Sequence, residues 1–257
     1  MPILLRARRL WMKYLVWPLL FTLLLIGACG KGTKDVLRIG THADYPPFEY
    51  QVDSTLVGID IDLGRRLAEK MDLEYEFKHM DFDDLLPALQ AGDIDIAISA
   101  LTITEERKHI VDFSVPYYVA NQTILTKQDN QTILDEATDL KDYIIGAQDG
   151  TTGYNYIKEN LVDKNLLSKE NLRIYAVISD AVKALVTGEC DFLILDNSPA
   201  HIFQKQYPLK TALTIETFES YGIALPKNAP LNERINQALQ DLIDSGEVLS
   251  IIQTHLR

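Results

Sequence analysis

Three consecutive segments decide the fold: VLRIGT (residues 36–41), DIDLGRRLAEKM (residues 60–71) and LEYEFK (residues 73–78). The outer two have the composition and alternation of β-strands. The middle segment places apolar side chains at helical spacing, namely Ile61, Leu63, Leu67, Ala68 and Met71. A strand, a helix and a second strand in succession are typical of an α/β fold whose mostly parallel sheets are covered by helices on both faces.

The rest of the chain continues this alternation of strands and helices. We expect further strands over residues 94–99, 123–126, 143–147, 173–177, 192–195 and 222–225. We expect helices over residues 83–91, 152–162, 179–187, 231–243 and 247–255. Ser179 is the expected N-cap of its helix, because its side chain can accept a hydrogen bond from the first turn.

Composition and charge exclude several classes of protein. The chain has 257 residues, of which 47% are hydrophobic and 24% charged, which is ordinary for a globular protein and excludes intrinsic disorder. The net charge is −12, whereas a general nucleic-acid-binding protein is basic, so we expect no nucleic-acid partner. Residues 1–28 contain four basic residues and no acidic residue, so the remaining chain carries a net charge of −16.

The N-terminal segment is typical of a secretory signal peptide. Basic residues precede an apolar run of about a dozen residues, which is shorter than the ~18 residues that a membrane-spanning helix needs. The run ends in IGAC (residues 26–29), which resembles a bacterial lipobox. This resemblance implies that Cys29 is lipidated and becomes the N-terminus of an exported, membrane-anchored protein. The alternative is cleavage near Ala28 with an unmodified Cys29.

Neither the second cysteine nor the histidines indicate a reactive centre. No His or basic residue stands beside Cys190 in GECDF (residues 188–192), so we expect a small buried side chain rather than a reactive thiol. The five histidines show no spacing typical of a metal site, and the sequence contains no Gly-rich phosphate loop. We therefore expect neither a metal nor a cofactor.

Several short motifs, taken in order, resemble one protein family. They are IGTHADYPPFEY (39–50), VGIDIDL (57–63), MDFDDLLPAL (80–89), GDID (92–95), TITEER (102–107), VDFSVPYY (111–118) and GTTG (150–153). In this order and spacing they resemble the polar amino-acid branch of bacterial extracellular solute-binding proteins, family 3. Members of this family are the capture subunits of ATP-binding-cassette (ABC) importers. The resemblance extends from about residue 36 to the C-terminus.

The resemblance implies two α/β lobes that are joined by two crossing strands and hold the ligand in the cleft between them. The expected boundaries are a signal peptide 1–28, a tether 29–34, a first lobe 35–120 plus 221–257, a second lobe 125–215, and hinge strands 119–124 and 215–220. Ligand binding would close the lobes by rotation about the hinge. The implied partners are a free amino acid and the permease of an ABC transporter. We expect a monomer in the periplasm or on the outer face of the cell envelope.

A free amino acid presents a carboxylate, an ammonium group and a side chain, and each needs a partner in a site that excludes water. A guanidinium offers a planar fork for a carboxylate, and the resemblance places the family's carboxylate-binding arginine at Arg107. From the residues alone, a surface ion pair with Glu105 or Asp112 is the alternative. Backbone N–H groups near Thr102 and Thr152 would share the carboxylate, because Thr151 and Thr152 open a helix.

The ammonium group needs an acidic partner at the same cleft. Asp196 ends a buried strand, at the edge where ligands of α/β proteins bind, and the resemblance places the ammonium-binding acid there. The alternative is that Asp196 caps the turn that begins at Asn197. The resemblance also implies that Ser99, Ala100 and the hydroxyl group of Thr102 line the site.

The ligand side chain is the least determined part. The resemblance places Tyr45 and Phe82 on either side of it, whereas core packing is the alternative for both rings. His42 stands where relatives that bind lysine or arginine often have Asp, which weakens the prediction of a basic ligand. Nearby acceptors that could restore it are Asp44, Glu49 and Gln148. We favour arginine or another basic amino acid, then glutamine, and an acidic ligand third.

An enzyme on the same scaffold is the rival hypothesis, because some cyclohexadienyl dehydratases resemble this fold. Such an enzyme needs a positioned general acid in the cleft. Glu49 and His42 are the candidates for that role, and neither has an evident partner in the sequence. We therefore predict a binding protein and no enzyme.

Overall fold

The structure is a computed structural model that describes residues 35–256. The predicted signal peptide, the lipid-modified Cys29 and the tether lie outside these residues. Among the described residues, no helix combines the length and the apolar character that crossing a membrane requires. Two five-stranded sheets and one small hairpin, β2 (Tyr50–Val52) with β3 (Thr55–Val57), form the β-structure of this region.

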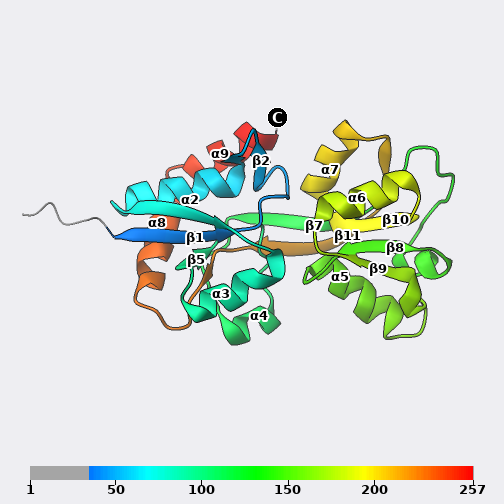
Figure 1. Ribbon diagram of the computed structural model, residues 1–257, viewed down its shortest axis with the longest axis horizontal. Coiled ribbons are helices and arrows are strands. Elements are labelled where there is room, and N and C mark those ends of the chain that lie inside the picture. Colours follow the sequence, from blue (N-terminus) through cyan, green and yellow to red (C-terminus); the bar gives the residue numbers. More distant parts are fainter. Residues whose placement is uncertain (1–34, 257) are drawn as a thin grey trace, which may run out of the picture. The chain divides into compact units, whose positions relative to one another are not determined.

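The first sheet has the strand order β4-β1-β5-β12-β6 (Figure 1). Its strands are β1 (Val36–Thr41), β4 (Glu74–His79), β5 (Ile96–Ala97), β6 (Asp112–Phe113) and β12 (Ala224–Leu225). β1 pairs in parallel with β4 and β5, whereas β12 pairs antiparallel with β5 and β6. A strand from late in the chain therefore completes a sheet that begins at its start.

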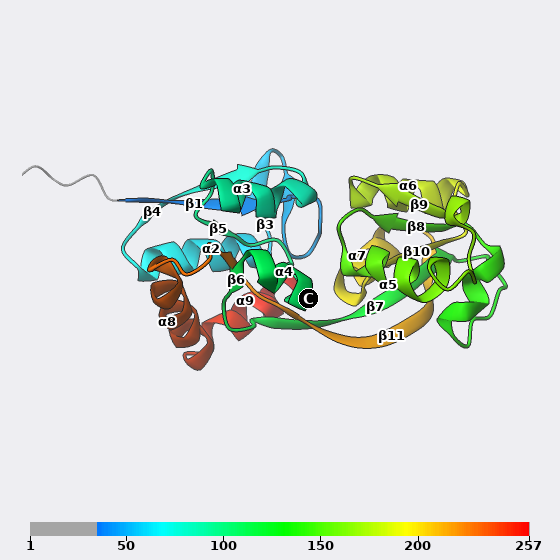
Figure 2. The ribbon, with the colours of Figure 1, turned by 90° about the horizontal axis from the view of Figure 1, so that it is seen from below.

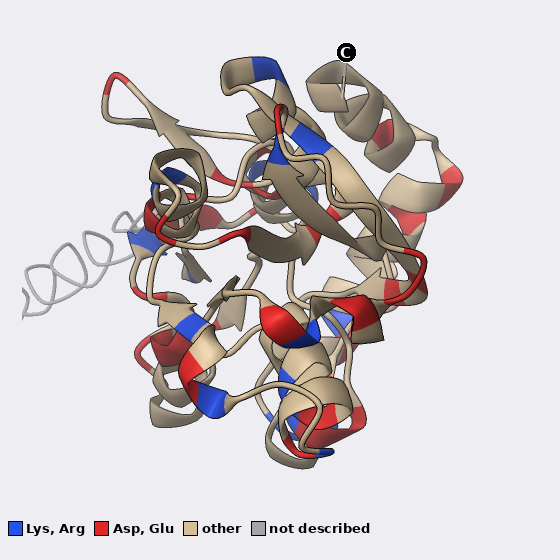
Figure 3. Ribbon diagram, turned by 90° about the vertical axis from the view of Figure 1, so that its right-hand side faces the viewer, with Lys and Arg blue, Asp and Glu red and all other residues tan. Residues whose placement is uncertain are grey.

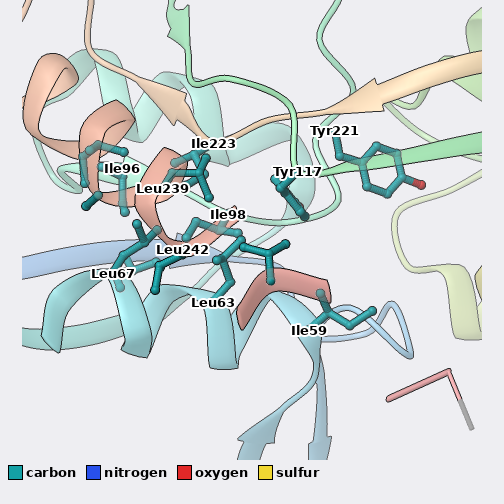
Figure 4. Packing of buried hydrophobic residues seen from close by; sticks show 14 of the residues in the cluster. Ile59, Leu63, Leu67, Ile96, Ile98, Tyr117, Tyr221, Ile223, Leu239 and Leu242 are labelled. Carbon is teal, nitrogen blue, oxygen red and sulfur yellow. The ribbon is translucent and has the colours of Figure 1, made fainter. Parts of the chain in front are cut away.

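Helices cover both faces of this sheet (Figures 1 and 2). One face carries α2 (Ile59–Lys70), α8 (Leu231–Asp244) and α9 (Glu247–Leu256), and the other carries α3 (Leu85–Ala91) and α4 (Glu105–Ile110). Figure 4 shows leucines of α2 and α8 packed against the sheet around Ile96 and Ile98, and these side chains are buried. We call the first sheet with these helices the first lobe.

The second sheet has the order β11-β7-β10-β8-β9. Its strands are β7 (Tyr118–Lys127), β8 (Ile145–Gln148), β9 (Leu172–Tyr175), β10 (Phe192–Asp196) and β11 (Leu209–Tyr221). β10 pairs in parallel with β8 and antiparallel with β7. Parallel pairing of β8 with β9 and antiparallel pairing of β7 with β11 complete the sheet.

Alternation along β10 explains how both faces of the second sheet are covered. Leu193 and Leu195 pack in one buried cluster with α6 (Ile178–Thr187) and α7 (Asn197–Gln206). Phe192 and Ile194 pack in another with α5 (Thr152–Ile157) and the π-helical turn η3 that follows it. Successive strand residues point to opposite faces, so the four-residue apolar run Phe192–Leu195 packs against helices on both. We call this sheet with its helices the second lobe.

Short helical turns complete the list of elements. They are η1 (Phe82–Asp84), η2 (Ala137–Asp142), η3 (Lys158–Val162) and η4 (Lys169–Asn171). The predicted helix over 152–162 is thus α5 continued by η3. Cys190 is buried, as predicted, and burial raises the pKa of its thiol to about 12.

Two long strands connect the lobes (Figure 2). β7 follows β6 of the first sheet, and β11 leads back to β12 of the same sheet. The two strands pair antiparallel from Tyr118 opposite Tyr221 to Lys127 opposite Leu209, with register irregularities between Thr211 and Leu213 and between Ile215 and Glu219. Figure 3 shows Lys and Arg positions interspersed with Asp and Glu positions along the ribbon.

The predicted start of one helix, with Ser179 as its N-cap, is wrong. α6 begins at Ile178 with Val177 as its N-cap residue, and no side chain of the helix's own N-terminus caps it. The N–H group of Ser179 instead donates to Asp44 Oδ2 at 2.9 Å, so the cap comes from the first lobe. A cap from a residue 135 positions away leaves no trace in the local sequence.

Candidate functional site

A cavity of about 20 Å³ is lined by residues of both lobes. Its lining contains most of the binding residues predicted from the sequence, namely His42, Tyr45, Phe82, Ser99, Ala100, Thr102, Arg107, Gln148, Thr151, Thr152 and Asp196. Glu49 also lines it. Residues spread over 155 positions of the chain therefore meet around one cavity.

The ends of the strands bring these residues together. His42 follows the last residue of β1, and Ser99 lies two residues after the end of β5. In the second lobe, Gln148 ends β8 and Asp196 ends β10. Because parallel strands end at one edge of a sheet, each lobe presents its polar residues at its carboxyl edge, which is where α/β proteins bind ligands.

Arg107 lies in the first turn of α4 and reaches across to the second lobe. Thr104 caps this helix, since its hydroxyl group accepts from the N–H group of Arg107 at 3.1 Å. The guanidinium donates to the carbonyl oxygens of Thr102 at 2.8 Å and Gly150 at 2.9 Å. It also lies over the ring of Phe82, with 5.5 Å from the guanidinium carbon to the ring centre. The predicted alternative, a surface ion pair with Glu105 or Asp112, is not formed: Glu105 pairs with Lys108, and Asp112 pairs with Lys227.

Burial lowers the pKa of Arg107, and the carboxylates of Glu219 and Asp196 act in the opposite direction. An arginine guanidinium stays protonated in proteins, so this site keeps a fixed positive charge. Two of its five N–H groups are used by the carbonyl oxygens, and the others remain for an anionic group.

Asp196 is buried and held by three side chains. Tyr45 donates to its Oδ2 at 2.7 Å and Tyr221 donates to the same atom at 2.6 Å. The amide of Gln122 donates to Oδ1. The Tyr45 hydroxyl oxygen also accepts from the N–H group of Asp196 at 3.2 Å, so the contact between the lobes is reciprocal.

The carboxylate of Asp196 does not cap the helix that follows. Asp196 occupies the N-cap position of α7, but its side chain makes no capping hydrogen bond. Burial, with the charge of Glu219, raises the pKa of Asp196 to about 6. The alternative reading of this residue as a local cap is therefore wrong, and its side chain is available to the cavity.

A second buried carboxylate shapes the backbone of the site. Asp60, in the first turn of α2, accepts from the N–H group of Ala100 at 2.6 Å and from the Tyr117 hydroxyl at 2.9 Å. Ala100 has a φ of 45°, a left-handed conformation that is unfavourable for a residue with a Cβ atom. The hydrogen bond to Asp60 offsets part of that cost and fixes the loop that lines the cavity.

Glu49 and His42 are buried side chains that line the same cavity. The Ser99 hydroxyl donates to Glu49 Oε1 at 2.9 Å, and the carboxyl groups of Glu49 and Asp60 are hydrogen-bonded to each other. His42 Nδ1 contacts the carbonyl oxygen of Met80 at 3.0 Å, and its Nε2 has no partner. Glu49 is 1% exposed and His42 is 3% exposed, so water in bulk does not satisfy that nitrogen. Burial, with the charge of Asp60, raises the pKa of Glu49 well above its ordinary value.

The predicted binding residues at the start of α5, the helix that follows β8, also line the cavity. Thr151 caps α5 by accepting from the N–H group of Tyr154 at 3.1 Å, and its hydroxyl donates to the Gln148 carbonyl at 2.8 Å. The amide of Gln148 donates to the Ala176 carbonyl at 3.1 Å. Thr151 therefore both caps α5 and lines the cavity, and the sequence allowed both roles for this turn.

Sequence reasoning missed three residues and misplaced one. Gln122, Glu219 and Tyr221 touch Asp196 or the threonines of the cavity, yet all three lie in or beside the strands between the lobes. No motif marks them, because their position depends on the pairing of β7 with β11. Asp44, proposed as an acceptor for a cationic tip, is not among the lining residues of the cavity and binds Ser179 instead.

Residues 35–256 contain no group of three or more His, Cys, Asp or Glu side chains arranged to hold a metal ion. The polar groups of the cavity comprise one guanidinium, two carboxyl groups, hydroxyl groups, an amide and an imidazole. Opposite charges on its walls suit a ligand that itself carries both signs of charge.

A family model described as bacterial extracellular solute-binding proteins, family 3, matches residues 37–257. The chain belongs to this family. It is 32% identical over 235 residues to the arginine-binding extracellular protein ArtP of Bacillus subtilis (strain 168), covering 89% of this chain and 90% of ArtP. An ancestral arginine-binding protein bound to arginine is 38% identical, with a TM-score of 0.81 and coverage of 87% and 99%. An ancestral arginine-binding protein bound to glutamine has a TM-score of 0.78, 38% identity and coverage of 86% and 98%.

These comparisons confirm the predicted family and the two-lobe fold of this solute-binding protein. They also confirm the prediction of a binding protein rather than an enzyme, since the relatives reported above are named as binding proteins. The likeness covers both lobes, because the matched region spans both sheets.

Proposed function

We propose that this solute-binding protein captures a free L-amino acid with a cationic side chain, arginine before others, for an ABC importer. The observation that supports this most is the buried carboxyl group of Glu49 in a cavity whose one guanidinium, Arg107, lies near Phe82. A cationic tip would favour the ionised form of this carboxyl group and donate to it.

Arg107 would bind the carboxylate of the amino acid. Its guanidinium has N–H groups beyond those used by the Thr102 and Gly150 carbonyls, and its position on Phe82 restricts its movement. A planar fork and a carboxylate form two parallel hydrogen bonds, which fixes the orientation of the ligand as well as its charge.

Asp196 would bind the ammonium group. Three donors already hold its carboxylate in place, so binding requires no reorganisation of the side chain. An ammonium group favours the ionised form of Asp196 and would lower the pKa that burial has raised to about 6. Arg107 and Asp196 would then bind the carboxylate and the ammonium group, which all free amino acids share.

The side chain of the ligand would extend between Tyr45 and Phe82 toward Glu49 and His42. Ring faces suit an aliphatic stem and a guanidinium. His42 Nε2 would accept a second hydrogen bond from the tip while His42 Nδ1 donates to the Met80 carbonyl. This pair of acceptors supports a basic ligand even though His42 replaces the Asp expected in lysine or arginine binders.

Glutamine is the second candidate. The raised pKa of Glu49 means that a protonated carboxyl group can donate to an amide oxygen as well as accept from an amide nitrogen. The ancestral relative bound to glutamine supports the same choice of ligands. Glu49 would therefore be the residue whose charge separates arginine from glutamine.

Anchoring and transport are part of the same proposal. A diacyl chain on Cys29 would hold the protein at the outer face of the cell envelope, as a monomer that meets the permease of its transporter. Closure of the lobes about β7 and β11 would present the loaded form to that permease. Binding from both lobes supports this order of events, since the cavity draws residues from each.

The test is a thermal-shift screen of the soluble form beginning at Lys31 against the twenty amino acids and ornithine. Ligands that bind only the native state raise the apparent stability, and isothermal titration calorimetry then gives their affinities. We expect arginine to give the largest shift, followed by lysine, ornithine or glutamine. A largest shift with aspartate or glutamate would overturn the assignment of Glu49, and no shift with any amino acid would overturn the proposal.

A further inference from the structure

Glu219, near the end of β11, is the centre of a hydrogen-bond network next to the cavity. Its Oε2 accepts from the hydroxyl of Thr102 at 2.9 Å and from the hydroxyl of Thr152 at 2.5 Å. Its Oε1 accepts from the amide of Gln122 at 3.0 Å. Thr102 belongs to the first lobe and Thr152 to the second, so one carboxylate contacts both.

The backbone explains why Glu219 reaches the cavity. The register of β11 against β7 shifts between Ile215 and Glu219, and Phe218 has a left-handed φ of 50°. Beyond this irregularity, the N–H group of Ile103 donates to the Ser220 carbonyl at 2.8 Å. The loop that contains Thr102 is thereby fixed beside the strand that contains Glu219.

These hydrogen bonds decide which atoms face the ligand. A threonine hydroxyl has one proton, and both Thr102 and Thr152 give theirs to Glu219. Each oxygen is then an acceptor beside the cavity that it lines, and Thr152 Oγ1 accepts from the Gln122 amide at 3.3 Å with one of its two lone pairs. Such an oxygen accepts from an ammonium group and cannot donate to a carboxylate.

The same network orients the ammonium-binding carboxylate. Gln122 donates through one amide nitrogen to Asp196 Oδ1 and to Glu219 Oε1. The same nitrogen lies 3.3 Å from Thr152 Oγ1, and the two acids are its nearer acceptors for two amide protons. Because Tyr45 and Tyr221 hold the other oxygen of Asp196, every polar neighbour of this carboxylate is a donor.

We propose that Glu219 is a positioning residue for ammonium recognition, which converts the hydroxyls of Thr102 and Thr152 into acceptors and fixes Asp196 through Gln122. This inference rests on the proposed function, because it assumes an amino acid in the cavity. Glu219 itself makes no contact with the ligand. It determines that the cavity walls offer hydrogen-bond acceptors rather than donors to the ammonium group of that ligand.

The charge of Glu219 affects the pH dependence of ligand binding, which a purely structural role would leave unchanged. Glu219 is the acid that most raises the pKa of Asp196, whose other neighbours are the hydroxyls of Tyr45 and Tyr221 and the amide of Gln122. Arg107 is the basic group on the first lobe whose charge acts on both acids. Removal of the charge on Glu219 lowers the pKa of Asp196, so ligand binding would persist to a lower pH.

The test compares wild type with Glu219→Gln and with Glu216→Gln, an exposed acid of the same strand. Each protein is titrated with L-arginine and with its 2-hydroxy analogue, in which a hydroxyl group replaces the ammonium; if wild type selects L-glutamine, the corresponding pair is used. We expect Glu219→Gln to lose about tenfold in affinity for the amino acid and little for the analogue, and Glu216→Gln to lose neither. The acid limb of binding should move to lower pH in Glu219→Gln alone.

Three results separate the possibilities. Equal losses for the amino acid and the analogue, with an unmoved acid limb, would show a structural role and overturn the inference alone. Binding of no amino acid by wild type would overturn the proposed function and this inference with it. If Glu219→Gln fails to fold in thermal unfolding, Glu219→Asp keeps the charge while shortening the side chain, and the same selective loss is then required.

Discussion

The Asp44 carboxylate of the first lobe accepts a 2.9 Å hydrogen bond from the Ser179 N–H group of the second lobe. Ser179 lies in the first turn of α6, whose N–H groups lack a cap from their own segment. A carboxylate at this position also interacts favourably with the helix dipole. The contact therefore ties the lobes together at a point outside the cavity lining.

Replacement of Asp44 tests whether contacts between the lobes contribute to binding. We expect Asp44→Ala to weaken ligand binding by about fivefold, since a helix cap is worth about 1 kcal/mol, with no change in ligand preference. Calorimetric titration of the preferred amino acid measures the effect. Asp129→Ala, at an exposed acid, is the control. An unchanged affinity in Asp44→Ala would show that this contact forms equally with and without ligand.

Gly58 supports the loop that holds Tyr45 and Glu49. It has a φ of 130°, and a Cβ atom at this position would lie 2.1 Å from the Phe48 carbonyl oxygen. The N–H groups of Ile59 and Asp60 bind the carbonyls of the same loop. We expect Gly58→Ala to cost more than about 3 kcal/mol in the free energy of unfolding, because backbone atoms must move.

Gly92→Ala is the matched control for Gly58→Ala. Gly92 also has a positive φ, of 78°, but no atom lies within 4 Å of an added Cβ. We expect a cost of about 1–2 kcal/mol there from the left-handed conformation alone. Urea unfolding followed by circular dichroism measures both variants. Similar costs in the two would mean that the loop around Phe48 adjusts without strain.

Arg107→Ala removes the proposed partner of the ligand carboxylate. We expect affinity for any amino acid to fall on the order of a hundredfold or more, because charge-assisted hydrogen bonds are lost in a buried place. Lys108→Ala, in the next position of α4, changes an exposed charge and should leave affinity unchanged. Circular dichroism should show both variants folded. Retained affinity in Arg107→Ala, measured by calorimetry, would move the carboxylate site elsewhere.

Glu49→Gln tests the proposed choice between arginine and glutamine. The substitution keeps the shape of the side chain and its hydrogen bond with Ser99 while it removes the ability of the group to ionise when a cationic ligand binds. We expect affinity for arginine to fall by about tenfold or more and affinity for glutamine to change much less. Competition between the two ligands, monitored by calorimetry, reports the ratio directly. Parallel losses for both would assign Glu49 to the scaffold.

The buried acids predict a characteristic dependence on pH. Asp196 has a pKa of about 6 in the protein described here, so its carboxylate must lose a proton before it can bind an ammonium group. Affinity should therefore fall about tenfold for each pH unit below about 6. Titrations from pH 8 to pH 5 measure this, and affinity that stays constant over that range would contradict it. Asp196→Asn should bind weakly throughout and lose the dependence.

Stability of the ligand-free protein should change with pH in the opposite direction. The folded-state pKa values of Asp60 and Asp196 are raised from 3.8 to about 6, so the folded state holds these protons more tightly than the unfolded chain. Their contribution to stability is then greatest below about pH 4 and declines as pH rises to about 6. Thermal unfolding between pH 4 and pH 7 measures the trend, and Asp60→Asn should reduce it.

Local patterns predicted much of this structure because its elements depend on short-range periodicity. The stripe of α2 and the apolar run of β10 each decide a buried face, and both were found from the sequence. The cavity residues were found through ordered motifs, and all of them converge in the structure. Their individual roles in binding stay predictions.

What the sequence did not reveal depends on pairing over long distances. Glu219 is placed by a register shift between two strands about 90 residues apart, which no local pattern encodes. Ser179 has the chemistry of an N-cap, yet Asp44 from the other lobe performs that task. In both cases a contact with a residue distant in the chain determines the local structure.

The burial of Cys190 has a practical consequence for observing the lobes move. It is the one cysteine among residues 35–256, and its raised pKa keeps the thiolate scarce at neutral pH. A soluble form that starts at Lys31 would lack Cys29 as well. Cysteines introduced at one exposed position of each lobe would therefore accept a pair of fluorescent dyes without competition. Energy transfer between the dyes could then follow each opening and closing event in single molecules.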